Sequence, residues 1–255
     1  MNEYYMDDSG VIYNGDCLHV LRQLPSDSVD AVCTDPPYSS GGLFRSDRTH
    51  NPADKYLNTA RGLVYPSFFG DNRDQHSWGF WCSLWISEAA RILKEGGYFF
   101  MFSDWRQLPT ASDALQSGGI VWRGVIVWDK TSAARAPHKN YFKHQCEYIL
   151  WGSKGKLDAC YNSNEPGPFA GLYSHMIYPK LKQHLTAKPV ALIEDILAPV
   201  KKGCVVLDPF LGSGTTACAC VNKGLKFIGV ELSQQYCEIS RRRLLHDCPI
   251  RSSKA

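Results

Sequence analysis

The chain has 255 residues, 44% hydrophobic and 21% charged, an ordinary globular composition that excludes a disordered, collagen-like or coiled-coil protein. Its net charge of +3 permits a nucleic-acid partner without indicating one. No apolar run is long enough for a membrane helix, and the acidic N-terminus is not a secretory signal, so we expect a cytoplasmic protein without membrane contact. The ten cysteines are scattered without a C-x-x-C pair, so we expect reduced thiols and no metal site.

Short apolar and β-branched runs alternate with stretches of helical spacing along the chain. The predicted strands, in chain order, are Val11–Tyr13, Val29–Thr34, Tyr98–Phe102, Val121–Trp128, Glu147–Trp151, Cys204–Leu207 and Phe227–Val230. The predicted helices are Trp78–Lys94, Pro189–Leu197, Thr215–Asn222 and Tyr236–Leu245. This alternation predicts an α/β fold in which helices cover both faces of a mostly parallel sheet.

The first predicted helix and two long loops indicate the domain organisation. The helix carries Trp78, Trp81 and Trp85 at a spacing typical of a core face, and we expect it to end at Gly96-Gly97. Residues 39–77 and 152–183 have few helical signals, and loops of this length are commonly functional. We therefore predict a single domain over residues 1–255 with two insertions, 39–77 and 152–183.

The first motif, Asp35-Pro36-Pro37-Tyr38, directly follows the predicted strand that ends at Thr34. Its prolines lack N–H groups and stiffen a turn at the carboxyl end of the strand, where parallel α/β folds place ligands. The Asp35 carboxylate and an adjacent main-chain carbonyl can accept both protons of an exocyclic amine, while Tyr38 stacks on the ring that bears it. A plain surface turn also explains these residues, because Asp-Pro commonly starts turns.

The second motif is a glycine-rich turn between a predicted strand and a predicted helix. Its residues are Asp208, Phe210, Gly212, Gly214 and Thr215. Glycines let the backbone approach a ligand closely, and Glu231, at the end of the next predicted strand, suits ribose hydroxyls. The Asp208 carboxylate would repel phosphate and attract an ammonium, so S-adenosylmethionine fits better than NAD or ATP. The glycine spacing alone also fits a nicotinamide dehydrogenase.

Together, the two motifs resemble those of the DNA amino-methyltransferases, specifically the permuted β class, in which D-P-P-Y comes early and F-x-G-x-G comes late. Further segments that resemble the family are Asn14–Asp16, Gly96–Phe100, Glu147–Trp151, His184–Pro189 and Gly229–Leu232 with Tyr236 and Arg241–Arg243. Leu185 replaces the usual proline of the family's H-P-T-x-K-P segment. The resemblance extends through nearly the whole chain. It implies that the insertion 152–183 is a short target-recognition region, and the aromatic-rich insertion 39–77 is expected to close over the target base.

The resemblance implies a circularly permuted, Rossmann-like sheet of seven strands, of the class I methyltransferase type. In this sheet Val11–Tyr13 lies beside Phe227–Val230, and Cys204–Leu207 lies beside Val29–Thr34. The aspartates of the two motifs would then face one cleft. The resemblance also implies that Asp16 contacts the adenine of the cofactor and that Lys188 precedes a helix beside the cofactor.

The activity that the resemblance implies is site-specific methylation of adenine N6 in duplex DNA by base flipping, as in restriction–modification systems. Hydrogen bonds from the amine to the Asp35 carboxylate and the Pro36 carbonyl would localise the nitrogen lone pair for an in-line attack on the methyl group. Aspartate at the first motif position favours adenine in the family, and methylation of cytosine N4 stays open. Carbon-5 methylation is disfavoured, because no cysteine follows a proline.

A basic stretch, residues 130–144, contains no acid and is predicted to contact DNA phosphates. The candidate contacts are Lys130, Arg135, Lys139 and Lys143. A solvated loop explains the same charges. We expect double-stranded DNA as the partner, and a homodimer is possible. A dehydrogenase and a catalytically silent DNA-binding module remain as rivals, although neither explains the Asp35–Tyr38 motif.

Overall fold

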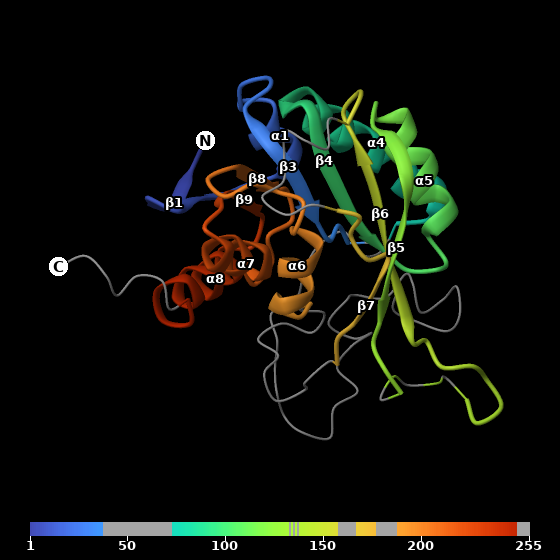
Figure 1. Ribbon diagram of the computed structural model, residues 1–255. Helices are drawn as coiled ribbons and strands as arrows, with labels where there is room; N and C mark the ends of the chain where they lie inside the picture. The colour runs from blue at the N-terminus through green and yellow to red at the C-terminus, as the bar shows by residue number, and fades with distance from the viewer. Residues whose placement is uncertain are drawn as a thin grey trace.

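The computed structural model describes residues 1–37, 73–132, 134, 136, 138–157, 167–176 and 188–248, which form helices packed on a central sheet (Figure 1). The sheet is mostly parallel and has nine strands in the order β1-β2-β9-β8-β3-β4-β6-β5-β7. In that order the strands are β1 (Glu3–Asp7), β2 (Gly10–Asn14), β9 (Lys226–Glu231), β8 (Val205–Asp208), β3 (Val29–Thr34), β4 (Leu93–Ser103), β6 (Cys146–Ser153), β5 (Val121–Asp129) and β7 (Leu172–Ser174). Strand β6 is antiparallel to both β4 and β5, and β1 is antiparallel to β2.

The α/β fold and the seven predicted strands are confirmed, and β3 has the predicted bounds. The predicted neighbours are also present, because β2 pairs with β9 and β8 pairs with β3, both in parallel. The sheet has nine strands rather than seven because β1 and β7 extend its two edges. Strand β1 has no buried residue and β7 has three residues, so neither shows the apolar run that marks a buried strand. The circular permutation stays a prediction.

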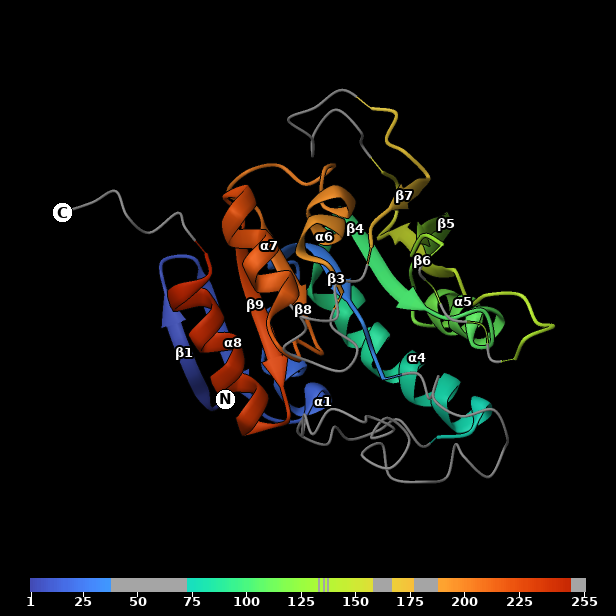
Figure 2. The same ribbon diagram turned by 90° about the horizontal axis from the view of Figure 1, so that it is seen from below.

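Helices cover both faces of the sheet, as Figure 2 shows from below. One face carries α1 (Cys17–Leu21), α4 (Gln75–Ile92) and α5 (Leu108–Ser117), and the other carries α6 (Val190–Ile196), α7 (Thr215–Lys223) and α8 (Gln234–His246). Successive residues of β4 point to opposite faces, so Phe99 packs in the first core and Phe100 in the second. Trp78 and Trp85 are fully buried in the first core, which confirms their predicted role.

Helix α4 begins at a strong cap and ends earlier than predicted. The Asp74 carboxylate accepts hydrogen bonds from the backbone N–H groups of the first turn, which satisfies donors that the helix cannot pair. Leu93 is extended, with φ −68° and ψ 135°, and starts β4, so the predicted end at Gly96-Gly97 was wrong. A Cβ on Gly97 would lie 2.5 Å from Leu93 Cδ1, so this glycine permits close strand packing rather than ending a helix.

The directions of the strands bring one end of each central strand to a common edge of the sheet, here called the carboxyl edge. Strands β2, β9, β8, β3 and β4 run parallel and end there, β6 begins there, and β5 ends there. In sheet order the polar residues at or directly after these ends are Asn14, Glu231, Asp208, Asp35, Asp104, Glu147 and Lys130. Residues from both sequence motifs therefore meet on one side of the molecule.

Three features of the described residues bear on the class of protein. None of their helices has the length and apolarity needed to cross a membrane. Within the same ranges, no group of three or more His, Cys, Asp or Glu side chains gathers as metal ligands. The nine cysteines that the structure describes are all free thiols.

Candidate active site

The turn between β8 and α7 presents its backbone at the carboxyl edge. Gly212 and Gly214 have φ values of 55° and 81°, in the left-handed region where a residue with a Cβ is strained. A Cβ on Gly214 would lie 2.9 Å from Ser240 Cβ and Oγ, whereas a Cβ on Gly212 would have only Phe210 O near it, at 4.0 Å. The turn is therefore packed tightly against α8 at Gly214 and is open to a ligand at Gly212.

Asp208, at the end of β8, is buried and joined to the neighbouring strand. Its Oδ1 accepts hydrogen bonds from Thr34 Oγ1 over 2.7 Å and from the Phe210 N–H over 3.0 Å. Loss of hydration raises the pKa of the Asp208 carboxyl to about 6, although hydrogen bonds from Thr216 and Thr34 lower it. The negative charge of Asp35 adds to the rise, because the two carboxylates lie at adjacent strand ends.

Glu231, at the end of β9, holds the other side of the glycine turn. Its Oε2 accepts a hydrogen bond from the Gly212 N–H over 2.9 Å, and its Oε1 accepts one from the Ser233 N–H over 2.7 Å. Burial raises the pKa of Glu231 to about 7, although these backbone donors lower it. The Glu231 side chain can still accept hydrogen bonds from hydroxyl or ammonium groups.

The Asp35-Pro36-Pro37 turn follows β3, whose neighbours are β8 and β4. Trp78 Nε1 of α4 donates a hydrogen bond to the Pro37 carbonyl oxygen over 2.6 Å, which fixes the far end of the turn to the helix. Lys188 Nζ lies 2.5 Å from Asp35 Oδ2. The turn is thus anchored by a neutral donor on one side and by an ammonium on the other.

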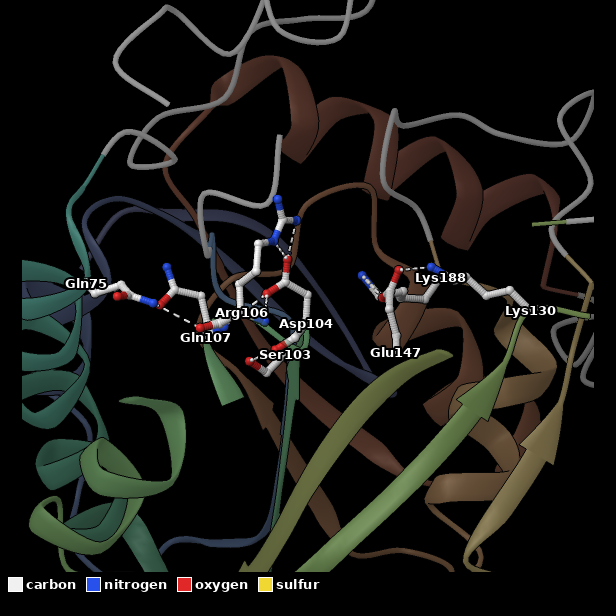
Figure 3. Close-up of polar contacts among 8 residues, drawn as sticks. All are labelled: Gln75, Ser103, Asp104, Arg106, Gln107, Lys130, Glu147 and Lys188. Carbon is white, nitrogen blue, oxygen red and sulfur yellow. Dashed lines mark hydrogen bonds and ion pairs between the residues drawn. The ribbon is translucent and has the colours of Figure 1, made fainter. Parts of the chain in front are cut away.

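Lys188 connects this turn to two more charged residues, and the four residues Lys130, Glu147, Lys188 and Asp35 are here called the charge row. Lys188 Nζ lies 3.5 Å from Glu147 Oε2, and Lys130 Nζ lies 3.2 Å from Glu147 Oε1. Figure 3 shows Glu147 between the two ammonium groups. Lys188 was predicted to lie beside the cofactor, and its ammonium here contacts two carboxylates of this row.

The remaining candidate cofactor residues surround the glycine turn or follow β2. Thr215 is buried as the first residue of α7. The Phe210 ring packs against Trp81 and Trp85, with ring centroids 5.3 and 5.1 Å apart. Asp16 is exposed and caps the N-terminus of α1, directly after the end of β2. These residues lie along the β2–β9–β8 part of the carboxyl edge.

The β5–β6 hairpin carries the residues that were predicted to contact DNA. Lys139 and Lys143 are exposed on it. Lys130 is not: its side chain is 14% exposed and is paired with Glu147, because it lies at the base of the hairpin rather than on its outer part. The structure thus gives Lys130 an internal ion pair, and its phosphate contact stays a prediction. Arg135 and Tyr38 lie outside the described residues.

Among the polar residues at the carboxyl edge that were not predicted as site residues are Thr34, Asp104 and Glu147. Asp104 Oδ1 accepts hydrogen bonds from the backbone N–H groups of Arg106 and Gln107, and its carboxylate pairs with the Arg106 guanidinium (Figure 3). Each of the three lies at or next to the end of a predicted strand. That position is the sequence signal that could have identified them.

The site combines a glycine turn, two acidic strand ends and an Asp-Pro-Pro turn on one edge of an α/β sheet. A family profile described as DNA methylase matches residues 29–169 and 161–242, a range that contains both motifs. The chain belongs to this family. As a member of the N6_N4_Mtase family, it is a DNA methyltransferase that modifies an exocyclic amine, and the Asp-Pro-Pro and glycine-turn motifs lie towards opposite ends of the matched range.

Individual relatives of this DNA methylase match it over most of their length. YubD of Escherichia coli (strain K12), which is named as a methylase, is 30% identical over 231 residues, 90% of this chain and 88% of YubD. Type II methyltransferase M2.DpnII of Streptococcus pneumoniae is 28% identical over 256 residues, 94% of this chain and 91% of that protein. The crystal structure of the M1.HpyAVI–SAM complex has a TM-score of 0.65 and 26% identity, and covers 91% of this chain and 98% of that one.

Proposed function

We propose that this DNA methylase transfers the methyl group of S-adenosylmethionine to the N6 amine of adenine in duplex DNA. One observation carries the proposal: Thr34 Oγ1, at the end of β3, donates to Asp208 Oδ1, at the end of β8, over 2.7 Å. The Asp-Pro-Pro turn and the glycine turn therefore open on the same edge of the sheet. A methyl donor bound at one turn can point at an amine bound at the other.

The glycine turn and its carboxylates fit S-adenosylmethionine. The open side of Gly212 admits a ligand, Glu231 suits ribose hydroxyls, and Asp208 suits the ammonium of an amino acid. The Asp208 carboxylate disfavours the pyrophosphate of NAD, which argues against a dehydrogenase. The cofactor, when bound, supplies an electrophilic sulfonium methyl group. The SAM complex of the relative M1.HpyAVI supports this choice of cofactor.

Asp35 and Pro36 would bind the target amine. The lone pair of an adenine amine is delocalised into the ring, so the amine is a weak nucleophile. Hydrogen bonds from its two N–H groups to the Asp35 carboxylate and the Pro36 carbonyl favour a pyramidal nitrogen whose lone pair faces the methyl group. The nitrogen becomes cationic as it bonds to the methyl carbon, the carbon–sulfur bond breaks and S-adenosylhomocysteine leaves. The cationic nitrogen then loses a proton to solvent water, so orientation rather than a strong base supplies much of the rate.

The β5–β6 hairpin provides a surface for DNA beside this site. Lys139 and Lys143 are exposed on it together with Tyr141 and Phe142, and 94% of Phe142 is accessible to solvent. Cations combined with exposed aromatic rings are typical of surfaces that bind nucleic acid. Flipping a base out of the duplex costs a few kcal/mol, and contacts of this kind offset the cost.

Adenine is favoured over cytosine because the first position of the catalytic motif is an aspartate, Asp35. Cytosine N4 is the second candidate, since its amine needs the same two acceptors and the family name joins N6 and N4 methylation. Single-molecule sequencing of DNA from cells that express the protein distinguishes the two. We expect N6-methyladenine at one sequence motif, whereas N4-methylcytosine would establish the second candidate.

Substitution Asp35→Ala tests the role of the catalytic turn. We expect methyl transfer to fall by about 10²–10³-fold or more, because the amine loses an acceptor that is needed most in the transition state. S-adenosylmethionine binding, measured by equilibrium dialysis, should stay within about twofold of wild type. Asp113→Ala, which removes an exposed carboxylate from α5, is the matched control and should leave both unchanged. Near-normal transfer by Asp35→Ala would overturn the assignment.

A further inference from the structure

The charge row consists of four side chains of alternating sign that come from four separate segments. Lys130 follows β5, Glu147 lies in β6, Lys188 precedes α6 and Asp35 follows β3. The N–O distances along the row are 3.2, 3.5 and 2.5 Å. No part of the reaction described above requires Glu147, Lys188 or Lys130, so their arrangement needs a separate explanation.

The row is buried against the sheet. The side chains of Lys188, Lys130 and Glu147 are 6%, 14% and 18% exposed. Lys188 Nζ lies 5.2 Å from the centroid of the Phe102 ring, which is itself buried in β4 between Asp35 and Glu147 in the sheet order. A buried charge is costly unless opposite charges compensate it, so each member of the row depends on its neighbours.

The interactions along the row favour the charged form of its members. Burial lowers the pKa of Lys188, but the Asp35 and Glu147 carboxylates raise it more, so the ammonium persists. Burial raises the pKa of Glu147, but Lys188 and Lys130 lower it more, so this carboxylate also persists. Lys188 thus presents a permanent positive charge to Asp35.

A second carboxylate, Asp208, ends the strand that neighbours β3. The charge of Asp35 contributes to the raised pKa of Asp208, so the two negative charges disfavour each other. A cation at Asp35 opposes this effect. A protonated Asp35 would be a poorer acceptor for the target amine, so an adjacent cation serves the proposed reaction.

We propose that Lys188 is a positioning residue that keeps the Asp35 carboxylate charged and oriented for the target amine, and that Glu147 and Lys130 hold Lys188 in place. The proposal rests on the function proposed above. Lys188 itself does not touch the reacting atoms. A carboxylate oxygen accepts more than one hydrogen bond, so the amine and Lys188 can share the Asp35 carboxylate.

Single-turnover methyl transfer to long unmethylated duplex DNA, measured with tritiated S-adenosylmethionine across pH, tests the role of Lys188. In Lys188→Met the acidic limb of the pH–rate profile should rise by about 1–3 pH units, because Asp35 has lost a cation while Asp208 remains. The rate at neutral pH should fall about 10- to 100-fold. Lys188→Arg keeps the charge and should restore the position of the acidic limb.

Glu147→Gln provides an independent test with an isosteric side chain. Lys188 then loses one carboxylate while the Lys130 ammonium stays nearby, so its own proton is held less tightly. The basic limb should therefore come down by about 1 pH unit or more. Lys94→Met is the matched control. It removes an ion pair of 2.7 Å between Lys94 of β4 and Asp30 of β3, at the ends of these strands that lie away from the carboxyl edge. Lys94→Met should leave the acidic and the basic limb of the pH–rate profile unchanged.

These experiments separate the inference from the proposed function. If wild-type protein transfers no methyl group to any DNA, the proposed function fails. If wild type is active and neither Lys188→Met nor Glu147→Gln moves a limb, the charge row is only structural and the inference is overturned. If Lys188→Met does not fold, as judged by circular dichroism, the Glu147→Gln profile alone decides.

Discussion

The cofactor turn and the charge row lie on the same edge of the sheet but are built in different ways. The glycine turn is contiguous in sequence, and its carboxylates, Asp208 and Glu231, are held by hydroxyl and backbone N–H donors. The charge row is assembled from four distant segments and is held by opposite charges. Burial raises the pKa values of the turn carboxyls more than their neutral donors lower them, whereas ion pairs keep the members of the charge row charged. The two regions should therefore respond differently to pH and to substitution.

The largest expected effect is a backbone disruption of the cofactor turn. Gly214→Ala places a Cβ at φ 81° and 2.9 Å from Ser240, which should destabilise the protein by about 2–4 kcal/mol and weaken S-adenosylmethionine binding. Urea unfolding and equilibrium dialysis measure the two effects. Gly224→Ala is the control, because φ is 67° there but no atom lies within 4 Å of the added Cβ. Its cost should be about 1 kcal/mol, with normal cofactor affinity.

A smaller effect distinguishes the two regions by pH. Glu231 has a pKa of about 7 in the fold against an ordinary value of 4.5, so the folded state binds more protons than the unfolded chain between these pH values. Its contribution to stability is therefore present below pH 4.5 and is lost as pH rises to about 7. We expect Glu231→Gln to remove about 2 kcal/mol of this pH dependence in urea unfolding without cofactor.

Glu238→Gln is the matched control for that experiment. Hydrogen bonds from Arg241 and Arg242 lower the pKa of Glu238 to about 2, so its stabilising contribution is lost only as pH falls below the ordinary value of 4.5. In Glu238→Gln, the change in unfolding free energy between pH 4.5 and 7 should therefore be the same as in wild type. Equal curves for wild type and Glu231→Gln would show that the Glu231 carboxyl is not perturbed by its surroundings.

The smallest effects compare lysines of the charge row with lysines on the surface of the same hairpin. Lys139→Ala and Lys143→Ala should each reduce the slope of log K against log salt by about 0.9 for duplex DNA, with no change in the pH profile of transfer. Lys130→Met should leave the salt slope unchanged, because its ammonium pairs with Glu147. Titrations of DNA binding at several salt concentrations measure the slopes. A reduced slope for Lys130→Met would show that Lys130 contacts a DNA phosphate.

Much of the fold could be predicted from the sequence because periodicity reports burial directly. The seven central strands are buried on one or both faces and appear as apolar runs, and α4 shows its core face through Trp78 and Trp85. Strands β1 and β7 could not be recognised, because edge strands are defined by backbone pairing rather than by apolar side chains. The end of α4 was misplaced because a glycine pair can either end a helix or allow close packing within a sheet, as Gly97 does here.

The candidate site could be predicted only in part. Asp35 and the glycine turn could be proposed as site residues because their chemistry follows from adjacent residues. Lys188 and Lys130 were expected to bind the cofactor and DNA, and the sequence did not reveal that both also pair with Glu147, a residue that had no predicted role. The residues adjacent to a lysine in the sequence do not indicate which carboxylate will form an ion pair with it.

The sequence by itself determined the alternation of strands and helices, the two stiff turns and the residues that each turn carries, because these depend on local backbone preferences and on burial. The family resemblance led us to expect β8 beside β3, and the structure confirms that strand pairing. Only the tertiary structure decided that Lys188 lies between Asp35 and Glu147. The physical reason is that charges interact through space, over distances set by the packing of strands, whereas separation along the chain does not enter.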